Sequence, residues 1–114
     1  MRLRTLLQLM ASETGIPDYS NPKATVWRNA QGNLHRDFGP AITCLDGAQF
    51  WYRNNELHRE DGPALVCSDG MQQWWVNNLR HREDGPAFVA ADGSREWWVN
   101  GLFVRREEGP EKEP

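Results

Sequence analysis

The sequence predicts an all-β fold, a single twisted antiparallel β-meander built from tandem units, with a short α-helix before it. Three observations lead to this expectation. Similar segments recur about every 23 residues, each contains two short β-prone runs such as QWWVN and PAFVA, and Asp-Gly pairs lie between the runs of successive segments. Repetition at such a period is typical of proteins in which each unit packs mainly on its neighbours.

Four units align, and they begin at Val26, Phe50, Gln73 and Glu96 (units 1 to 4). Units 2 to 4 match nearly residue for residue, with the sequences FWYRNNELHREDGPALVCSDG, QWWVNNLRHREDGPAFVAADG and EWWVNGLFVRREEGP. Unit 1 has one additional residue before its histidine, and unit 4 has Val104 in place of the histidine and gains Glu108. Such departures are expected at the ends of an array.

The turns follow from the polar residues between the β-prone runs. The Asp-Gly pairs 46/47, 69/70 and 92/93 predict two-residue hairpin turns with positive φ that join successive units. Within a unit, a polar segment such as 78–84, closed by Gly85-Pro86, predicts a loop, because proline lacks the N–H that a central strand needs. Together these signals predict about seven or eight short strands.

The two ends of the chain differ from the units. Leu3, Leu6, Leu7 and Met10 have the spacing of an apolar helical face, which predicts a short helix that covers an edge or a face of the sheet. The predicted organisation is therefore helix and linker over 1–24, with the linker at 15–24, four units over 25–110, and an acidic tail over 111–114.

Charge and hydropathy exclude several classes of protein. Thirteen basic and 16 acidic residues give a net charge of −3, so we expect no binding to duplex nucleic acid. No apolar run approaches the roughly 20 residues of a membrane span. The apolar run near the N-terminus is short and is interrupted by Gln8, which does not fit a signal peptide, and we expect a cytoplasmic protein. Eleven arginines against two lysines suggest fixed partners for the guanidinium groups.

Neighbouring aromatic residues on the strands place rings on both faces of the sheet. Because successive side chains point to opposite faces, one ladder contains Trp51, Trp74 and Trp97 and the other contains Tyr52, Trp75 and Trp98. We expect one ladder to be buried and the other to be partly covered, and a large apolar surface left open often marks an interaction site. The alternative is that both ladders serve only the packing between units.

The units resemble the MORN-repeat variant, a relative of the MORN repeat. The resemblance covers residues 26–110 and is carried by W-V-N-G/N, L-H-R-E-D-G-P-A, an apolar strand and D-G. It implies a single curved sheet and binding to proteins or membrane-associated partners without catalysis. Arrays of this variant are familiar in viral and phage proteins, so the resemblance also implies a phage product that acts on a host factor. Phe38 in place of the usual Asp, and the missing fourth histidine, argue against a function that needs one histidine in every unit.

The histidines and cysteines recur with the units. Equivalent positions lie two strands, roughly 10 Å, apart, too far for His35, His58 and His81 to share a metal ion. We expect these histidines to bond to nearby backbone or carboxylate groups. The same spacing excludes a disulfide between Cys44 and Cys67, which we expect to be free thiols without a nucleophilic role.

The charged residues of the HREDGP segments recur as well, and they give two hypotheses. The arginines, at positions 36, 59, 82 and 105, either pair with nearby carboxylates or, together with the tryptophans, grip an acidic or planar ligand. A column of equivalent carboxylates is not the asymmetric cluster that catalysis needs, and no nucleophile elbow, phosphate-binding loop or metal spacing is present. We therefore expect neither enzyme activity nor a cofactor.

The leading hypothesis is a non-catalytic module, encoded by a phage, that binds and blocks a host defence protein. Interfaces favour Trp, Tyr and Arg at their centres, and the residues expected to bind are Tyr52, Trp75, Trp98, Arg59 and Arg82. The first alternative is a protein that sequesters a nucleotide-like ligand between Trp and Arg. The second is a homodimer or larger homo-oligomer formed through the open sheet edges.

Overall fold

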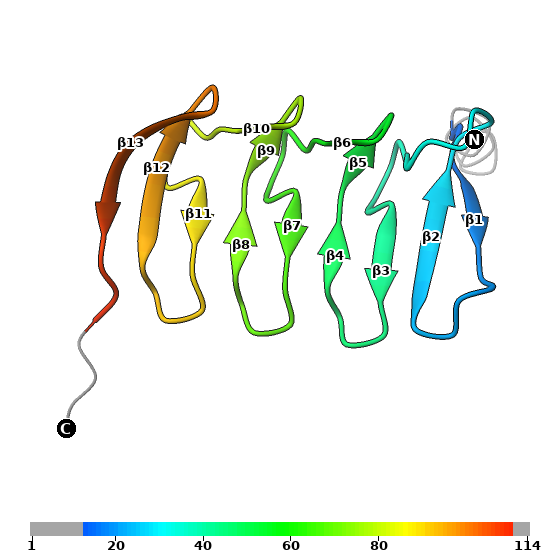
Figure 1. Ribbon diagram of the computed structural model, residues 1–114, viewed down its shortest axis with the longest axis horizontal. Helices are drawn as coiled ribbons and strands as arrows, with labels where there is room; N and C mark the ends of the chain where they lie inside the picture. The colour runs from blue at the N-terminus through cyan, green and yellow to red at the C-terminus, as the bar shows by residue number, and fades with distance from the viewer. Residues whose placement is uncertain (1–12, 111–114) are drawn as a thin grey trace, which may run out of the picture.

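The computed structural model describes residues 13–110 as one antiparallel β-meander with two small accessory hairpins (Figure 1). The main sheet has nine strands, in the order β1 (Ile16–Asp18), β2 (Ala24–Arg28), β3 (Ile42–Cys44), β4 (Gln49–Phe50), β7 (Leu65–Val66), β8 (Gln72–Gln73), β11 (Phe88–Val89), β12 (Arg95–Val99) and β13 (Leu102–Glu107). The accessory hairpins pair β5 (Tyr52–Arg53) with β6 (Glu56–Leu57) and β9 (Trp75–Val76) with β10 (Leu79–Arg80). The predicted all-β meander is confirmed.

The described residues contain more strands than the sequence indicated, thirteen in place of seven or eight. Part of the difference arises because the strand direction breaks at Trp51 and Trp74, so that units 2 and 3 each add a separate short hairpin. β1 also lies inside the segment predicted as a linker, where Ile16 pairs with Arg28 and Pro17 with Trp27. Proline is tolerated in β1 because it is an edge strand. The predicted helix at Leu3 to Met10 lies outside the described residues.

The two kinds of turn have exchanged the roles expected from the sequence. The two-residue turns with positive φ at both positions are Asn54-Asn55, Asn77-Asn78 and Asn100-Gly101, within the units. Segment 78–84 therefore begins with a hairpin turn and β10, where an uninterrupted loop was predicted. Asparagine tolerates left-handed φ better than most side chains, so these pairs form the tight hairpins.

The Asp-Gly pairs form longer turns than predicted. In the first of them the N–H of Gly47 donates to the Cys44 carbonyl at 3.0 Å and that of Cys44 to the Ala48 carbonyl at 2.8 Å. Only the glycine has positive φ, because the Asp46 carboxylate accepts the Ala48 N–H at 3.0 Å and stabilises the ordinary turn conformation. The loop therefore has three residues and ends in a left-handed glycine.

The sheet is a single layer, and only small side chains are fully enclosed. The buried apolar residues among those described are alanines, at positions 41, 48, 64 and 87. All six tryptophans are half-buried. The expectation that one aromatic ladder would be buried is wrong, because residues 13–110 form no second layer over either face and the rings of both ladders stay partly open. No helix that could cross a membrane occurs in the described part of the chain.

Candidate functional site

Each unit stacks the arginine of its HREDGP-like segment on its own first tryptophan. The guanidinium carbon lies 3.5 to 4.1 Å from the ring centroid, in the pairs Arg36–Trp27, Arg59–Trp51, Arg82–Trp74 and Arg105–Trp97. This distance is well within the range of a cation–π contact. The arginines are therefore part of the packing of the sheet.

The rest of the segment holds that guanidinium in place. Arg59 donates from Nη1 to the Pro63 carbonyl at 3.1 Å and from Nε to Asp61 at 2.9 Å. A Cβ atom on Gly62 would lie 2.8 Å from the Arg59 Cζ, so a side chain there would displace the stack. These contacts leave the guanidinium with fewer donors for a phosphate, which weakens the nucleotide alternative.

Unit 1 lacks one of these contacts. Phe38 stands where units 2 and 3 have Asp61 and Asp84. Arg36 keeps the contact of Nη1 with the Pro40 carbonyl, at 3.3 Å, but its Nε is buried and has no hydrogen-bond partner among the described residues. The departure of Phe38 from the repeat pattern therefore leaves an unused donor.

The second aromatic ladder has an arginine within it. Arg80 Cζ lies 5.1 Å from the centroid of Trp75 and 4.9 Å from that of Trp98. Phe88 lies 5.2 Å away, and Glu96 Oε1 is 3.8 Å from Nη1. Burial lowers the pKa of Arg80, although the Glu96 charge partly offsets this. Units 1, 2 and 4 have Leu34, Leu57 and Phe103 at this position, so the departure from an apolar residue was a signal that sequence reasoning missed.

One exposed aromatic side chain continues this surface into the C-terminal hairpin. Phe103 pairs with Trp98 across β12 and β13 and contacts its ring edge-on, with centroids 5.4 Å apart. Phe103 is 55% exposed. We call Trp75, Arg80, Trp98 and Phe103 the aromatic face. The exposed Leu79, Val99 and Leu102 are the strand neighbours of these residues, so the register places them on the opposite side.

The predicted binding residues divide between the two ladders. Trp75 and Trp98 belong to the aromatic face, on either side of Arg80, and Tyr52 is half-buried in unit 2. Arg59 and Arg82 stack instead on Trp51 and Trp74, in the other ladder. The five residues thus do not form one stack.

The histidines join each unit to the next, as expected for loop histidines bonded to backbone. His35, His58 and His81 accept the N–H of Asn54, Asn77 and Asn100 on Nδ1, at 3.2, 3.0 and 2.9 Å. We infer that the neutral rings carry their proton on Nε2. In unit 4, Val104 occupies the histidine position and lies at a bulge in β13, which pairs with β12. The described residues contain no later hairpin turn whose N–H a histidine at this position could accept.

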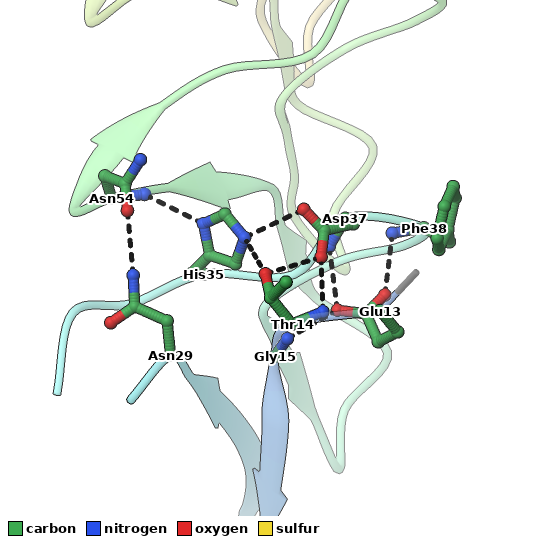
Figure 2. A network of polar contacts seen from close by, with 8 residues as sticks. All are labelled: Glu13, Thr14, Gly15, Asn29, His35, Asp37, Phe38 and Asn54. Atoms are coloured by element: carbon green, nitrogen blue, oxygen red, sulfur yellow. Dashed lines mark hydrogen bonds and ion pairs between the residues drawn. The ribbon is translucent and has the colours of Figure 1, made fainter. Parts of the chain in front are cut away.

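His35 is the centre of a polar network that the sequence did not reveal (Figure 2). Its Nε2 lies 2.9 Å from both Asp37 Oδ1 and Thr14 Oγ1, and the Thr14 hydroxyl donates to Asp37 Oδ2 at 2.7 Å. Burial alone would raise the pKa of Asp37, but the hydrogen bonds from Thr14 and His35 outweigh it and lower the pKa. Glu13-Thr14-Gly15 has the spacing of Glu60-Asp61-Gly62, a signal that could have identified it.

Two open clefts separate the HREDGP-like segments of neighbouring units. The first has a volume of about 550 Å³ and lies between Arg36–Gly39 of unit 1 and His58–Asp61 of unit 2. The second has about 650 Å³ and lies between Arg59–Gly62 and His81–Asp84. Three arginines and three carboxylates line the first cleft, whereas two arginines and four carboxylates line the second. The two clefts therefore differ in charge.

The described residues offer little reactive chemistry. Within 13–110 no three His, Cys, Asp or Glu side chains are grouped so as to hold a metal ion. Cys44 and Cys67 are free thiols, as predicted. Burial and the nearby charges of Asp69 and Asp46 raise the pKa of Cys67, which disfavours the nucleophilic thiolate.

Comparisons with protein-family models, with curated proteins and with solved structures found no match to this chain. The function of the chain is therefore inferred from the geometry of the two ladders and the clefts, and from the resemblance of the units to the MORN-repeat variant.

Proposed function

We propose that the chain is a non-catalytic, repeat-built module that binds a protein partner through its aromatic face. The observation that carries this proposal is the stack of Trp75, Arg80 and Trp98, extended by the exposed ring of Phe103. Aromatic and arginine side chains dominate the energetic centres of protein interfaces.

The packing of the aromatic face favours binding. The Trp75 indole N–H donates to Gln73 at 2.9 Å and that of Trp98 to Glu96 at 2.8 Å. Rings held in this way lose little rotamer freedom when a partner covers them, which lowers the entropic cost of association. The exposed Phe103 ring beside Trp98 supplies apolar surface that a partner would remove from water.

The identity of the partner rests on the resemblance to MORN-repeat-variant arrays. That resemblance favours a phage-encoded protein, and hence a host protein as the target, blocked by occupancy of its surface. Cytoplasmic location is part of the same proposal.

Capture of the partner by matched variants tests the proposal. Phe103→Ser removes the most exposed side chain of the aromatic face, and Leu45→Ser, at an 83% exposed position in the turn between β3 and β4, is the control. Wild type and control should recover the same protein from a host lysate, and the Phe103→Ser variant should lose it, with all three folded by circular dichroism. Equal recovery by all three would refute the assignment of this face.

A further inference from the structure

The first cleft combines two polar groups that the described chain leaves unused. Only three buried side-chain polar atoms among residues 13–110 lack a hydrogen-bond partner, and two of them, Arg36 Nε and His58 Nε2, belong to residues that line this cleft. The His58 side chain is 5% exposed, and Glu60 Oε1 lies 3.4 Å from its Nε2 without hydrogen-bond geometry. Buried donors without a partner are unfavourable, so the cleft is suited to a ligand that accepts hydrogen bonds.

The chain itself shows how such a ligand binds, at the equivalent position in unit 1 (Figure 2). The Glu13 carboxylate accepts the backbone N–H groups of Asp37 and Phe38, at 3.0 and 3.1 Å. The Thr14 hydroxyl bridges His35 Nε2 and Asp37. Gly15 follows, where a Cβ atom would lie 2.6 Å from the His35 carbonyl oxygen. An acidic residue, a hydroxyl residue and a glycine thus provide hydrogen-bond partners for the His35 ring and the backbone N–H groups in the loop of unit 1, and fit closely against it.

The loop of unit 2 presents the same groups without such a segment. His58 corresponds to His35, and Glu60 and Asp61 correspond to Asp37 and Phe38. Within residues 13–110 the backbone N–H of Glu60 donates no hydrogen bond, and that of Asp61 reaches only the Asp61 carboxylate. In place of a docked segment there is the cleft of about 550 Å³, a volume within the range of peptide and ligand sites.

We propose that this first cleft is a second binding site, which takes an extended peptide segment of a partner with the sequence acid, Ser or Thr, Gly. The ligand carboxylate accepts the N–H groups of Glu60 and Asp61, and the ligand hydroxyl accepts from His58 Nε2 and donates to Glu60. A carbonyl oxygen of the same segment meets Arg36 Nε on the opposite wall. The inference goes beyond the aromatic face and does not depend on it.

Charge selects the first cleft over the second. The first has as many arginines as carboxylates, and Phe38 replaces the aspartate that would repel an acidic ligand. The second has two more carboxylates than arginines, among them the exposed Glu83 and Asp84. Like charges disfavour an acidic segment, so the second cleft serves as an internal control.

Binding of acetyl-Glu-Thr-Gly-amide to the full chain, followed by the backbone amide NMR shifts, tests the proposal. At millimolar concentrations of this probe peptide, the amide resonances of Glu60 and Asp61 should shift, and those of Glu83 and Asp84 should not. Acetyl-Glu-Val-Gly-amide, without the hydroxyl, should bind about tenfold more weakly, the effect of losing one hydrogen bond.

A variant provides the matched protein control. Phe38→Asp gives Arg36 a carboxylate partner, like the aspartates of units 2 and 3. This variant should keep the fold, and its affinity for the probe peptide should be about tenfold weaker. The proposal would be overturned by the absence of shifts or by equal shifts in the second cleft. It would also be overturned if the valine peptide bound as tightly as the threonine peptide, or if the Phe38→Asp variant bound the threonine peptide as tightly as wild type. Shifts confined to Asp37 and Phe38 would also contradict it, because they would mean that the peptide displaces residues 13–15. None of these outcomes bears on the aromatic face, whose test uses Phe103.

Discussion

Gly62→Ala should destabilise the fold by displacing an arginine from a tryptophan. The new Cβ atom would lie 2.8 Å from the Arg59 Cζ, a distance that carbon atoms do not sustain, so the guanidinium must move. The stack on Trp51, at 3.9 Å, and the hydrogen bonds to Asp61 and the Pro63 carbonyl would then weaken together. Each contributes about 1 kcal/mol to stability.

An opposing effect reduces the loss. Gly62 does not have positive φ, so alanine adds no backbone strain and lowers the entropy of the unfolded chain, a gain of about 0.4–1 kcal/mol. The net loss in free energy of unfolding should be about 2 kcal/mol, by combination of these terms. Urea unfolding followed by circular dichroism measures it.

The decisive control is the same substitution without the arginine. In an Arg59→Ala background the clash is absent and only the entropic term remains, so Gly62→Ala should become neutral or stabilising. The sign of its effect thus depends on Arg59. An equal loss in both backgrounds would refute the stacking argument.

Three further predictions concern other contacts. Phe38→Asp should raise the free energy of unfolding by about 0.5–1 kcal/mol, because it gives the buried Arg36 Nε a partner; thermal unfolding checks this, and a loss would contradict it. Asn78→Ala should cost about 1 kcal/mol because residue 78 has a φ of 66°, whereas Asn78→Gly should be nearly neutral; equal losses in chemical unfolding would count against the turn assignment. Asp37→Asn should lose about 1 kcal/mol at neutral pH by weakening the contacts with Thr14 and His35. The pKa of Asp37 is lowered by folding, so its contribution is present above the unfolded value of about 3.9 and is lost as pH falls through the folded value; wild type and variant should converge in acid, and a constant difference would exclude this linkage.

The repeat pattern predicted the meander because its signals are local. The alternation of β-prone runs and turn residues fixes which strands are neighbours, and that order is observed. The turn types were assigned wrongly because Asp-Gly can form either a two-residue turn or a longer one, and the sequence does not show that Asp46 bonds to the Ala48 N–H. Asn100-Gly101, a strong signal for a tight hairpin, pointed to the correct position.

The candidate sites were harder to predict, because they depend on contacts between units. That Arg59 would stack on Trp51 and not on Tyr52 follows from the path of the chain at the break in the strand. The role of Arg80 and the docking of Thr14 on His35 join residues 18 to 21 positions apart. The free thiols were predicted correctly because strand spacing excluded a disulfide. The histidines were expected to bond to nearby backbone or carboxylate groups, and they bond to backbone N–H groups.

The native mass spectrum of the tagged chain, recovered with its bound material from a host lysate, would show whether the aromatic face binds a protein. We expect a stoichiometric complex with a second protein, lost when Trp75 and Trp98 are both replaced by alanine in a chain of unchanged circular dichroism. A bare chain, a homodimer, or a chain with only a small adduct would contradict it.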